Sequence, residues 1–140
     1  MKRLLLILIV SLVVSCQSSD DGNPILPNVP VNETVFLNNP SSLPLLSPGG
    51  SIAINGGISG IFVYNLNNNQ YFAYDRACPH LTLQECNTPM VINDGLNMEC
   101  TCDGTKFALA LGGAPQSGTQ FSAREYKVIK NGDTLIITNF

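Results

Sequence analysis

The sequence predicts an all-β domain, a small antiparallel sandwich or barrel, and three observations lead to this fold class. From about residue 34 onwards, short runs of β-branched and aromatic residues alternate with turns rich in Asn, Gly and Asp. No segment after the apolar start of the chain has a convincing helical period. The length of 140 residues is enough for one domain and not two.

The expected strands are, in chain order, 34–37, 51–54, 61–64, 71–74, 126–130 and 134–138. The Asn-rich turn at 67–70 predicts a hairpin between the third and fourth of these runs. Asn131-Gly132-Asp133 predicts a closing hairpin between the last two, which is the clearest hairpin in the chain. Another turn is expected at Asn93-Asp94-Gly95.

The composition excludes several classes of function. Tryptophan is absent and His80 is the single histidine, so a site with two histidine ligands cannot form. The formal net charge is −3, and no stretch combines Lys or Arg with aromatic residues. Nucleic acid is not an expected partner, because phosphate binding requires a cationic face.

The first fifteen residues have the pattern of a secretory signal peptide. Met1-Lys2-Arg3 is a basic start, and the run from Leu4 to Val14 is apolar apart from Ser11. This run is shorter than the roughly 20 residues that a membrane-spanning helix needs. A buried amphipathic helix is the alternative, but the run is apolar on all sides and shows no helical stripe.

The end of this segment, Leu12-Val13-Val14-Ser15-Cys16, resembles the lipobox of bacterial lipoproteins. The resemblance implies cleavage before Cys16, lipidation of Cys16 and attachment to a membrane. The acidic stretch 17–22 is similar to the tether of outer-membrane lipoproteins, which implies the cell envelope, facing the periplasm or the surface. An ordinary signal peptide with an incidental cysteine is the alternative. The predicted organisation is a signal peptide (1–15), a lipidated cysteine with a Pro-rich linker (16–33) and a domain (34–140).

Four further cysteines, Cys78, Cys86, Cys100 and Cys102, lie within 25 residues of one another. In an exported protein such a group favours two disulfides. A Cys100–Cys102 bridge across a single residue would be strained, which leaves two of the three pairings open.

The surroundings of these cysteines resemble a Rieske iron–sulphur domain. Cys78-Pro79-His80 is similar to the first Rieske box, Cys-x-His, and Cys100-Thr101-Cys102-Asp103-Gly104 is similar to the second, Cys-x-x-His. The hairpin before the first box, the Gly-rich loop 112–118 and the closing hairpin resemble the same family. The resemblance covers about 100 residues and implies a Rieske-like fold with a cluster-binding subdomain.

The resemblance also implies a set of ligands. Cys78 and Cys100 would bind one iron of a 2Fe-2S cluster, and His80 would bind the other. Asp103 stands where the family has its second histidine ligand, and a carboxylate there would add negative charge and lower the reduction potential. Cys86 and Cys102 are the implied structural disulfide.

Two functions are therefore expected from the sequence. The first is an electron-transfer lipoprotein that carries a 2Fe-2S cluster and passes electrons to a redox partner protein. The alternative is a metal-free binding or structural module of the envelope, in which Cys78–Cys100 forms a second disulfide. A zinc site built from Cys78, His80, Cys100 and Asp103 is a third possibility. A stand-alone enzyme is not expected, because Rieske domains usually serve an oxidase or oxygenase supplied elsewhere.

Overall fold

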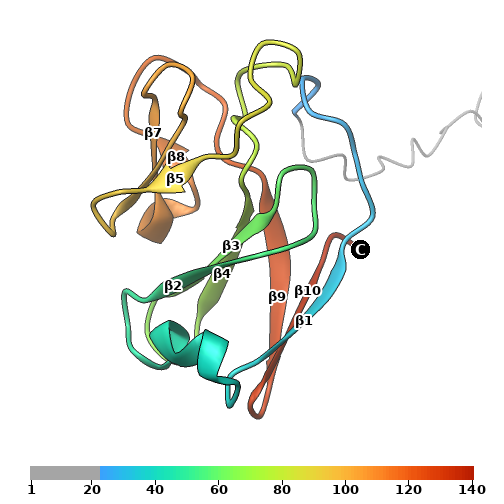
Figure 1. Cartoon of the computed structure of the whole chain (residues 1–140), viewed down its shortest axis with the longest axis vertical. Helices are drawn as coiled ribbons and strands as arrows, with labels where there is room; N and C mark the ends of the chain where they lie inside the picture. Colours follow the sequence, from blue (N-terminus) through green and yellow to red (C-terminus); the bar gives the residue numbers. More distant parts are fainter. Residues whose placement is uncertain (1–22) are drawn as a thin grey trace, which may run out of the picture.

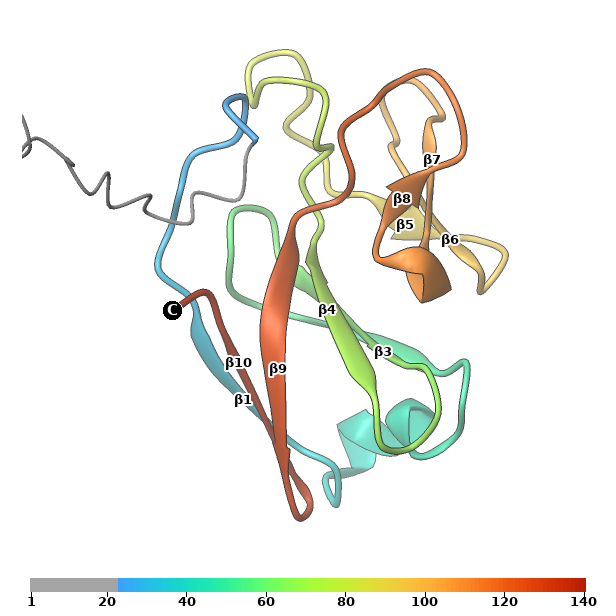
Figure 2. The ribbon, with the colours of Figure 1, turned by 180° about the vertical axis from the view of Figure 1, so that it is seen from behind.

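The computed structural model describes residues 23–140, so the predicted signal peptide, Cys16 and the first part of the predicted linker lie outside it. In the described range, a larger antiparallel sheet carries a smaller one beside one of its ends (Figure 1), and Figure 2 shows both from behind. Among residues 23–140, no helix has the length and apolarity required to cross a bilayer.

The strands of the larger sheet follow the spatial order β1-β10-β9-β4-β3-β2. Their bounds are β1 (Asn32–Phe36), β2 (Ser51–Ile54), β3 (Ile61–Asn65), β4 (Tyr71–Asp75), β9 (Glu125–Asn131) and β10 (Thr134–Thr138). The smaller sheet contains β5 (Val91–Ile92), β6 (Asn97–Glu99), β7 (Lys106–Ala108) and β8 (Ala114–Pro115). Two short 3-10 helices, η1 (Pro40–Leu46) and η2 (Leu109–Leu111), complete the described elements.

The predicted all-β, antiparallel fold class is confirmed. The loops that carry the four cysteines adjoin strands of the smaller sheet, where the resemblance implied a cluster-binding subdomain. All six expected strands form, each within two residues of its predicted bounds. The four strands of the smaller sheet were not predicted. Each has only two or three residues, too few to show the alternation of apolar and polar residues that marks a strand.

Strand β3 separates two hydrophobic cores, and all five of its residues are buried. Its side chains alternate between the two faces of the sheet. Ile61 and Val63 contribute to the core formed with β1, β9 and β10, whereas Phe62 and Tyr64 contribute to the core beneath the smaller sheet. The second core also contains Cys78, Cys86, Cys100, Met90, Met98, Phe107 and Leu109. The cysteines are therefore part of the packing between the two sheets.

The segment before β1 packs on the domain, which differs from the linker expected for it. Leu26 and Val31 are only 5% and 1% exposed. The guanidinium of Arg124 donates hydrogen bonds to the backbone carbonyls of Leu26 and Pro27. The folded unit therefore includes Leu26 and Val31, which composition alone assigned to the linker. These two apolar residues stand among prolines and asparagines, so the composition of the stretch does not indicate that they are buried.

Candidate metal centre

Two loops bring the predicted ligands together. The first loop leaves the end of β4 and contains Cys78 and His80, and the second connects β6 to β7 and contains Cys100 and Asp103. The second loop is a tight turn, in which the Gly104 amide donates to the Cys100 carbonyl at 2.8 Å. Gly104 has φ of +78°, a left-handed conformation that other residues adopt only with strain.

Asp75, the last residue of β4, fixes the path of the first loop. Its buried carboxylate accepts hydrogen bonds from the backbone amides of Ile58, Ser59 and Ala77 and from the hydroxyl of Tyr126. Gly57 approaches this carboxylate so closely that a Cβ there would lie 2.3 Å from Oδ2 of Asp75. The Asp75 carboxylate thus ties the end of β4, the turn after β2 and β9 to one point, three residues before Cys78.

Both cysteine pairs are closed in this structure. Cys78 is bonded to Cys100, and Cys86 is bonded to Cys102. The Cys86–Cys102 bridge is the one that the Rieske resemblance implies, whereas the Cys78–Cys100 bridge is the one that the metal-free alternative requires. Cys78, Cys86 and Cys100 are buried, and Cys102 is exposed.

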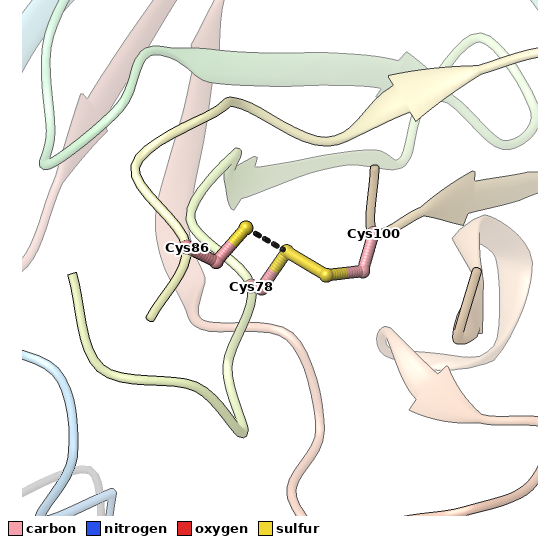
Figure 3. Close-up of side chains that lie close together, drawn as sticks. All are labelled: Cys78, Cys86 and Cys100. Carbon is pink, nitrogen blue, oxygen red and sulfur yellow. Dashed lines mark hydrogen bonds between the residues drawn. A yellow bond between two sulfur atoms is a disulfide. The ribbon is translucent and has the colours of Figure 1, made fainter. Parts of the chain in front are cut away.

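The two bridges touch each other. Sγ of Cys86 lies 3.5 Å from Sγ of Cys78, and Figure 3 shows this contact beside the Cys78–Cys100 bridge. Neither sulfur of the dashed contact has a proton to donate, because both belong to disulfides, so the contact is one of packing. The ligand atoms of Cys78, Cys86 and Cys100 all lie within 4.8 Å of one another.

His80 joins the two loops through its imidazole ring. Nε2 lies 2.6 Å from Oδ2 of Asp103, and the ring centroid lies 5.8 Å from that of Phe107. The side chain of His80 is only 11% exposed. Nδ1 is buried and has no hydrogen-bond partner among the described residues. The ring therefore directs one nitrogen to a surface carboxylate and leaves the other unpaired inside the protein.

Asp103 is held at both carboxylate oxygens. Oδ2 contacts His80, and Oδ1 accepts a hydrogen bond from the backbone amide of Thr105 at 3.0 Å. Partial burial raises the pKa of Asp103, but the hydrogen bonds from His80 and Thr105 outweigh it and the net pKa lies below the usual value. Asp103 is therefore an anion at neutral pH.

The donor set fits a 2Fe-2S cluster at three of the four expected positions. Cys78 and Cys100 place their sulfurs side by side in the interior, and His80 presents an unpaired buried nitrogen. The ligand atoms of His80, Cys100 and Asp103 lie within 4.8 Å of one another. Asp103 differs from His80, because both of its oxygens already have protein partners, and the Cys78 and Cys100 sulfurs are bonded to each other.

Two residues near the site were not predicted from the sequence. Asp75 anchors the first loop, and its position as the last residue of a strand, two residues before an amide that it binds, is a recognisable turn signal. Thr88 lies beside the outer bridge, with Oγ1 at 3.2 Å from Sγ of Cys102 and at 2.9 Å from Oγ1 of Thr101. Its role depends on the fold of the loop between the cysteines, and nothing in the sequence indicates it.

Comparisons with known proteins found likenesses of structure only. No family model and no curated protein matches the chain. Among solved structures, the ferredoxin of carbazole 1,9a-dioxygenase from Nocardioides aromaticivorans IC177 is 21% identical, with a TM-score of 0.48 over 79% of this chain and 97% of that chain. A chain from the complex of reduced oxygenase and oxidized ferredoxin in carbazole 1,9a-dioxygenase is 24% identical, with a TM-score of 0.44 over 65% of this chain and 82% of that chain. The Escherichia coli protein NirD is 13% identical, with a TM-score of 0.47 over 78% of this chain and 98% of that chain.

Proposed function

We propose that the chain is a Rieske-type 2Fe-2S electron carrier, held at the cell envelope through a lipid on Cys16. The observation that carries this proposal is the buried Nδ1 of His80, which has no partner among the described residues. An unpaired buried polar atom costs about 1–3 kcal/mol, and coordination of a metal would remove that cost. Nε2 of the same ring contacts the carboxylate of Asp103, which leaves Nδ1 as the nitrogen available to a metal.

The ligands of the proposed cluster are Cys78 and Cys100 for one iron and His80, through Nδ1, for the other. Asp103 is the proposed fourth ligand, and it would bind iron in place of its present contact with His80. When bound, the cluster would supply one-electron transfer, and the protein would pass that electron to a partner protein. The residues themselves place an imidazole and a carboxylate side by side near the surface, where the His80 and Asp103 side chains are 11% and 38% exposed.

The ligand thiolates of Cys78 and Cys100 exist only when the bridge between these residues is reduced. Thiolate is the form of cysteine that binds metal. The proposed function therefore requires a reducing step before or during cluster insertion. While this bridge is closed, as it is in the structure, neither sulfur can serve as a thiolate ligand.

A second candidate function is favoured by the same bridge. With both pairs closed, the two loops are covalently joined twice, and the fold needs no metal. The chain would then be a disulfide-stabilised binding or structural module of the envelope. Zinc is the remaining candidate, because Cys78, His80, Cys100 and Asp103 supply the S, N and O ligands that zinc accepts.

The electron carrier, the metal-free module and the zinc site differ in the metal that the protein retains. We would purify the full-length chain anaerobically after expression with added iron and measure iron, acid-labile sulfide and zinc. The electron carrier predicts about two irons and two sulfides per chain. Cys78→Ser and His80→Ala should lose them, whereas the control Asp133→Asn, which changes an exposed acid in the turn between β9 and β10, should retain them. Zinc without sulfide would support the zinc site, and neither metal in any preparation would support the metal-free module.

A further inference from the structure

We propose that the two cysteine pairs form a thiol–disulfide relay, in which an external dithiol reduces the exposed Cys86–Cys102 bridge and Cys86 then opens the buried Cys78–Cys100 bridge. The substrate class is a reduced dithiol in the compartment to which the chain would be exported, such as the paired cysteines of a reductase domain. The relay deepens the proposed function, on which its biological role rests, because it releases the two cysteines assigned to iron. The exchange chemistry itself needs no metal.

Accessibility separates the two bridges. Cys102 is exposed, whereas Cys78 and Cys100 are 2% and 0% exposed. Thiol–disulfide exchange requires a thiolate to reach a sulfur atom directly, so access controls its rate. An external dithiol can therefore reach the Cys86–Cys102 bridge at Cys102 but cannot reach either sulfur of the inner bridge in the folded protein.

Cys86 connects the exposed bridge to the buried one. Its sulfur is bonded to Cys102 and lies 3.5 Å from Sγ of Cys78, which is close to contact distance. Figure 3 shows the Cys86 sulfur beside the Cys78 end of the Cys78–Cys100 bridge. The Cys86 and Cys100 sulfurs lie within 4.8 Å of one another, so the three sulfurs are bent at Cys78. Once released from Cys102, Cys86 must therefore turn about its side-chain bonds to attack Cys78 from the side opposite Cys100.

The relay balances in sulfurs and electrons. One thiolate of the dithiol attacks Sγ of Cys102, the Cys86–Cys102 bond breaks, and Cys86 leaves as a thiolate. The second thiol of the reductant then attacks the mixed disulfide, which releases Cys102 as a thiol and the reductant as its own disulfide. Cys86 attacks Sγ of Cys78, forms a Cys78–Cys86 bond and expels Cys100, which takes up a proton.

A last exchange completes the transfer. The thiolate of Cys102 attacks Sγ of Cys86, which restores the outer bridge and releases Cys78. In total, one dithiol is oxidised and the Cys78–Cys100 bond gains two electrons and two protons, while the Cys86–Cys102 bridge ends as it began. The two freed thiols are those of the proposed iron ligands, and they lie in the loops that also carry His80 and Asp103.

The test compares two single variants of the full-length chain that both lose the outer bridge. Cys102→Ser leaves Cys86 free beside Cys78, and the matched control Cys86→Ser leaves Cys102 free and exposed. Both are purified aerobically in the presence of a metal chelator, quenched in acid, alkylated and mapped by mass spectrometry. We expect Cys102→Ser to contain the Cys78–Cys86 bond together with alkylated Cys100, and Cys86→Ser to retain only Cys78–Cys100. Alkylated Cys86 with an intact Cys78–Cys100 bond in Cys102→Ser would overturn the relay.

A second test uses the wild-type chain, so its outcome does not depend on whether a variant folds. One molar equivalent of dithiothreitol is added to the metal-free protein, and the free thiols are mapped at successive times. The relay predicts that free thiols move from Cys102 to Cys100 and Cys78, with the Cys78–Cys86 bond as an intermediate. Free thiols that remain at Cys86 and Cys102 would contradict the relay. Since neither test measures iron, failure of the relay and failure of cluster binding are distinguished.

Discussion

Nε2 of His80 and Oδ2 of Asp103 lie 2.6 Å apart and join the two cysteine loops through their side chains. Because the backbone amide of Thr105 holds the other oxygen of Asp103, the carboxylate has a fixed position in the second loop. The imidazole is fixed in turn, with Nδ1 in the interior. The aspartate that replaces the expected histidine thus has a definite partner, and its charge is the chemical difference between this site and a two-histidine site.

The charge of Asp103 sets the first prediction. Asp103→His should raise the reduction potential of the cluster by roughly 100 mV or more, because it replaces an anion next to iron by a neutral imidazole. Redox titration followed by electron paramagnetic resonance measures the change. The control is Asp133→Asn, an exposed acid in the turn between β9 and β10, which should leave the potential nearly unchanged. Equal shifts in both variants would show that Asp103 acts only through net charge.

Asp75 should be one of the most sensitive positions for stability. Asp75→Ala leaves the amides of Ile58, Ser59 and Ala77 and the hydroxyl of Tyr126 without this acceptor. We expect a loss of about 3 kcal/mol or more in the free energy of unfolding, because each buried donor without a partner costs about 1–3 kcal/mol. Urea denaturation of Asp75→Ala and of the exposed control Asp133→Asn measures the difference. A loss below about 1 kcal/mol would mean that water replaces the carboxylate.

The outer bridge should stabilise the fold mainly by restricting the unfolded chain. Cys86 and Cys102 are 16 residues apart, and closing a loop of this length contributes about 3 kcal/mol. The double variant Cys86→Ser/Cys102→Ser should lose this amount in urea denaturation under oxidising conditions. With a reductant present, the wild-type chain loses both bridges and the variant loses only Cys78–Cys100. The free energy of unfolding should therefore fall by more in the wild-type chain than in the variant. An unchanged midpoint in the double variant would show that the bridge stores strain equal to its entropic benefit.

Acid should weaken the turn that precedes β6. The carboxylate of Asp94 accepts hydrogen bonds from the side chain and amide of Asn97 and from the amide of Leu96, and it lies 3.6 Å from the ammonium of Lys106. These bonds, that of the Asn97 side chain first, hold the pKa of Asp94 well below 3.8. Since the folded state lowers this pKa, the stabilisation is fully present above about pH 4 and is lost as the pH falls through the lowered value.

The variant Asp94→Asn isolates this group. The difference in unfolding free energy between wild type and Asp94→Asn should be constant above about pH 5 and should shrink towards acid pH. Denaturation midpoints of both proteins, measured across the acid range, show whether this difference shrinks or grows as the pH falls. A difference that grows as the pH falls would contradict the assignment.

The proposed membrane anchoring depends on Cys16, which lies outside the described residues. Cys16→Ser should release the protein from the membrane fraction, because the proposed lipid is attached to that sulfur. Ser18→Ala, a change two residues away in the tether, should leave the membrane association unchanged. Fractionation with mass analysis of the N-terminal peptide measures both the location and the lipid. Membrane association of Cys16→Ser would contradict the lipoprotein proposal.

The sequence predicted those parts of the fold that depend on regular patterns over five or more residues. β3 and β4 could be predicted because β-branched and aromatic residues flank an Asn-rich turn. The smaller sheet could not, since its pairs join only two or three residues from strands with no alternation of their own. Likewise, Leu26 and Val31 are single apolar residues among prolines, and only the finished sheet provides the surface that buries them.

The candidate site was predictable in its membership but not in its contacts. The spacing of the two boxes brought Cys78, His80, Cys100 and Asp103 into one hypothesis, and the structure places them in adjacent loops. The contact of Asp103 with Nε2 of His80 and the contact between the two bridges could not be predicted from the sequence. Both depend on side-chain directions at the meeting point of two loops, which no local pattern encodes.

Electron paramagnetic resonance of the dithionite-reduced protein, after anaerobic purification of the full-length chain, tests the central claim most directly. A 2Fe-2S centre held by Cys78, Cys100 and His80 predicts a reduced-state signal with average g below about 2, which disappears in His80→Ala and persists in Asp133→Asn. The absence of any such signal, with no iron or acid-labile sulfide even after chemical reconstitution of the fully reduced chain, would contradict the electron-carrier function and leave the disulfide-stabilised envelope module.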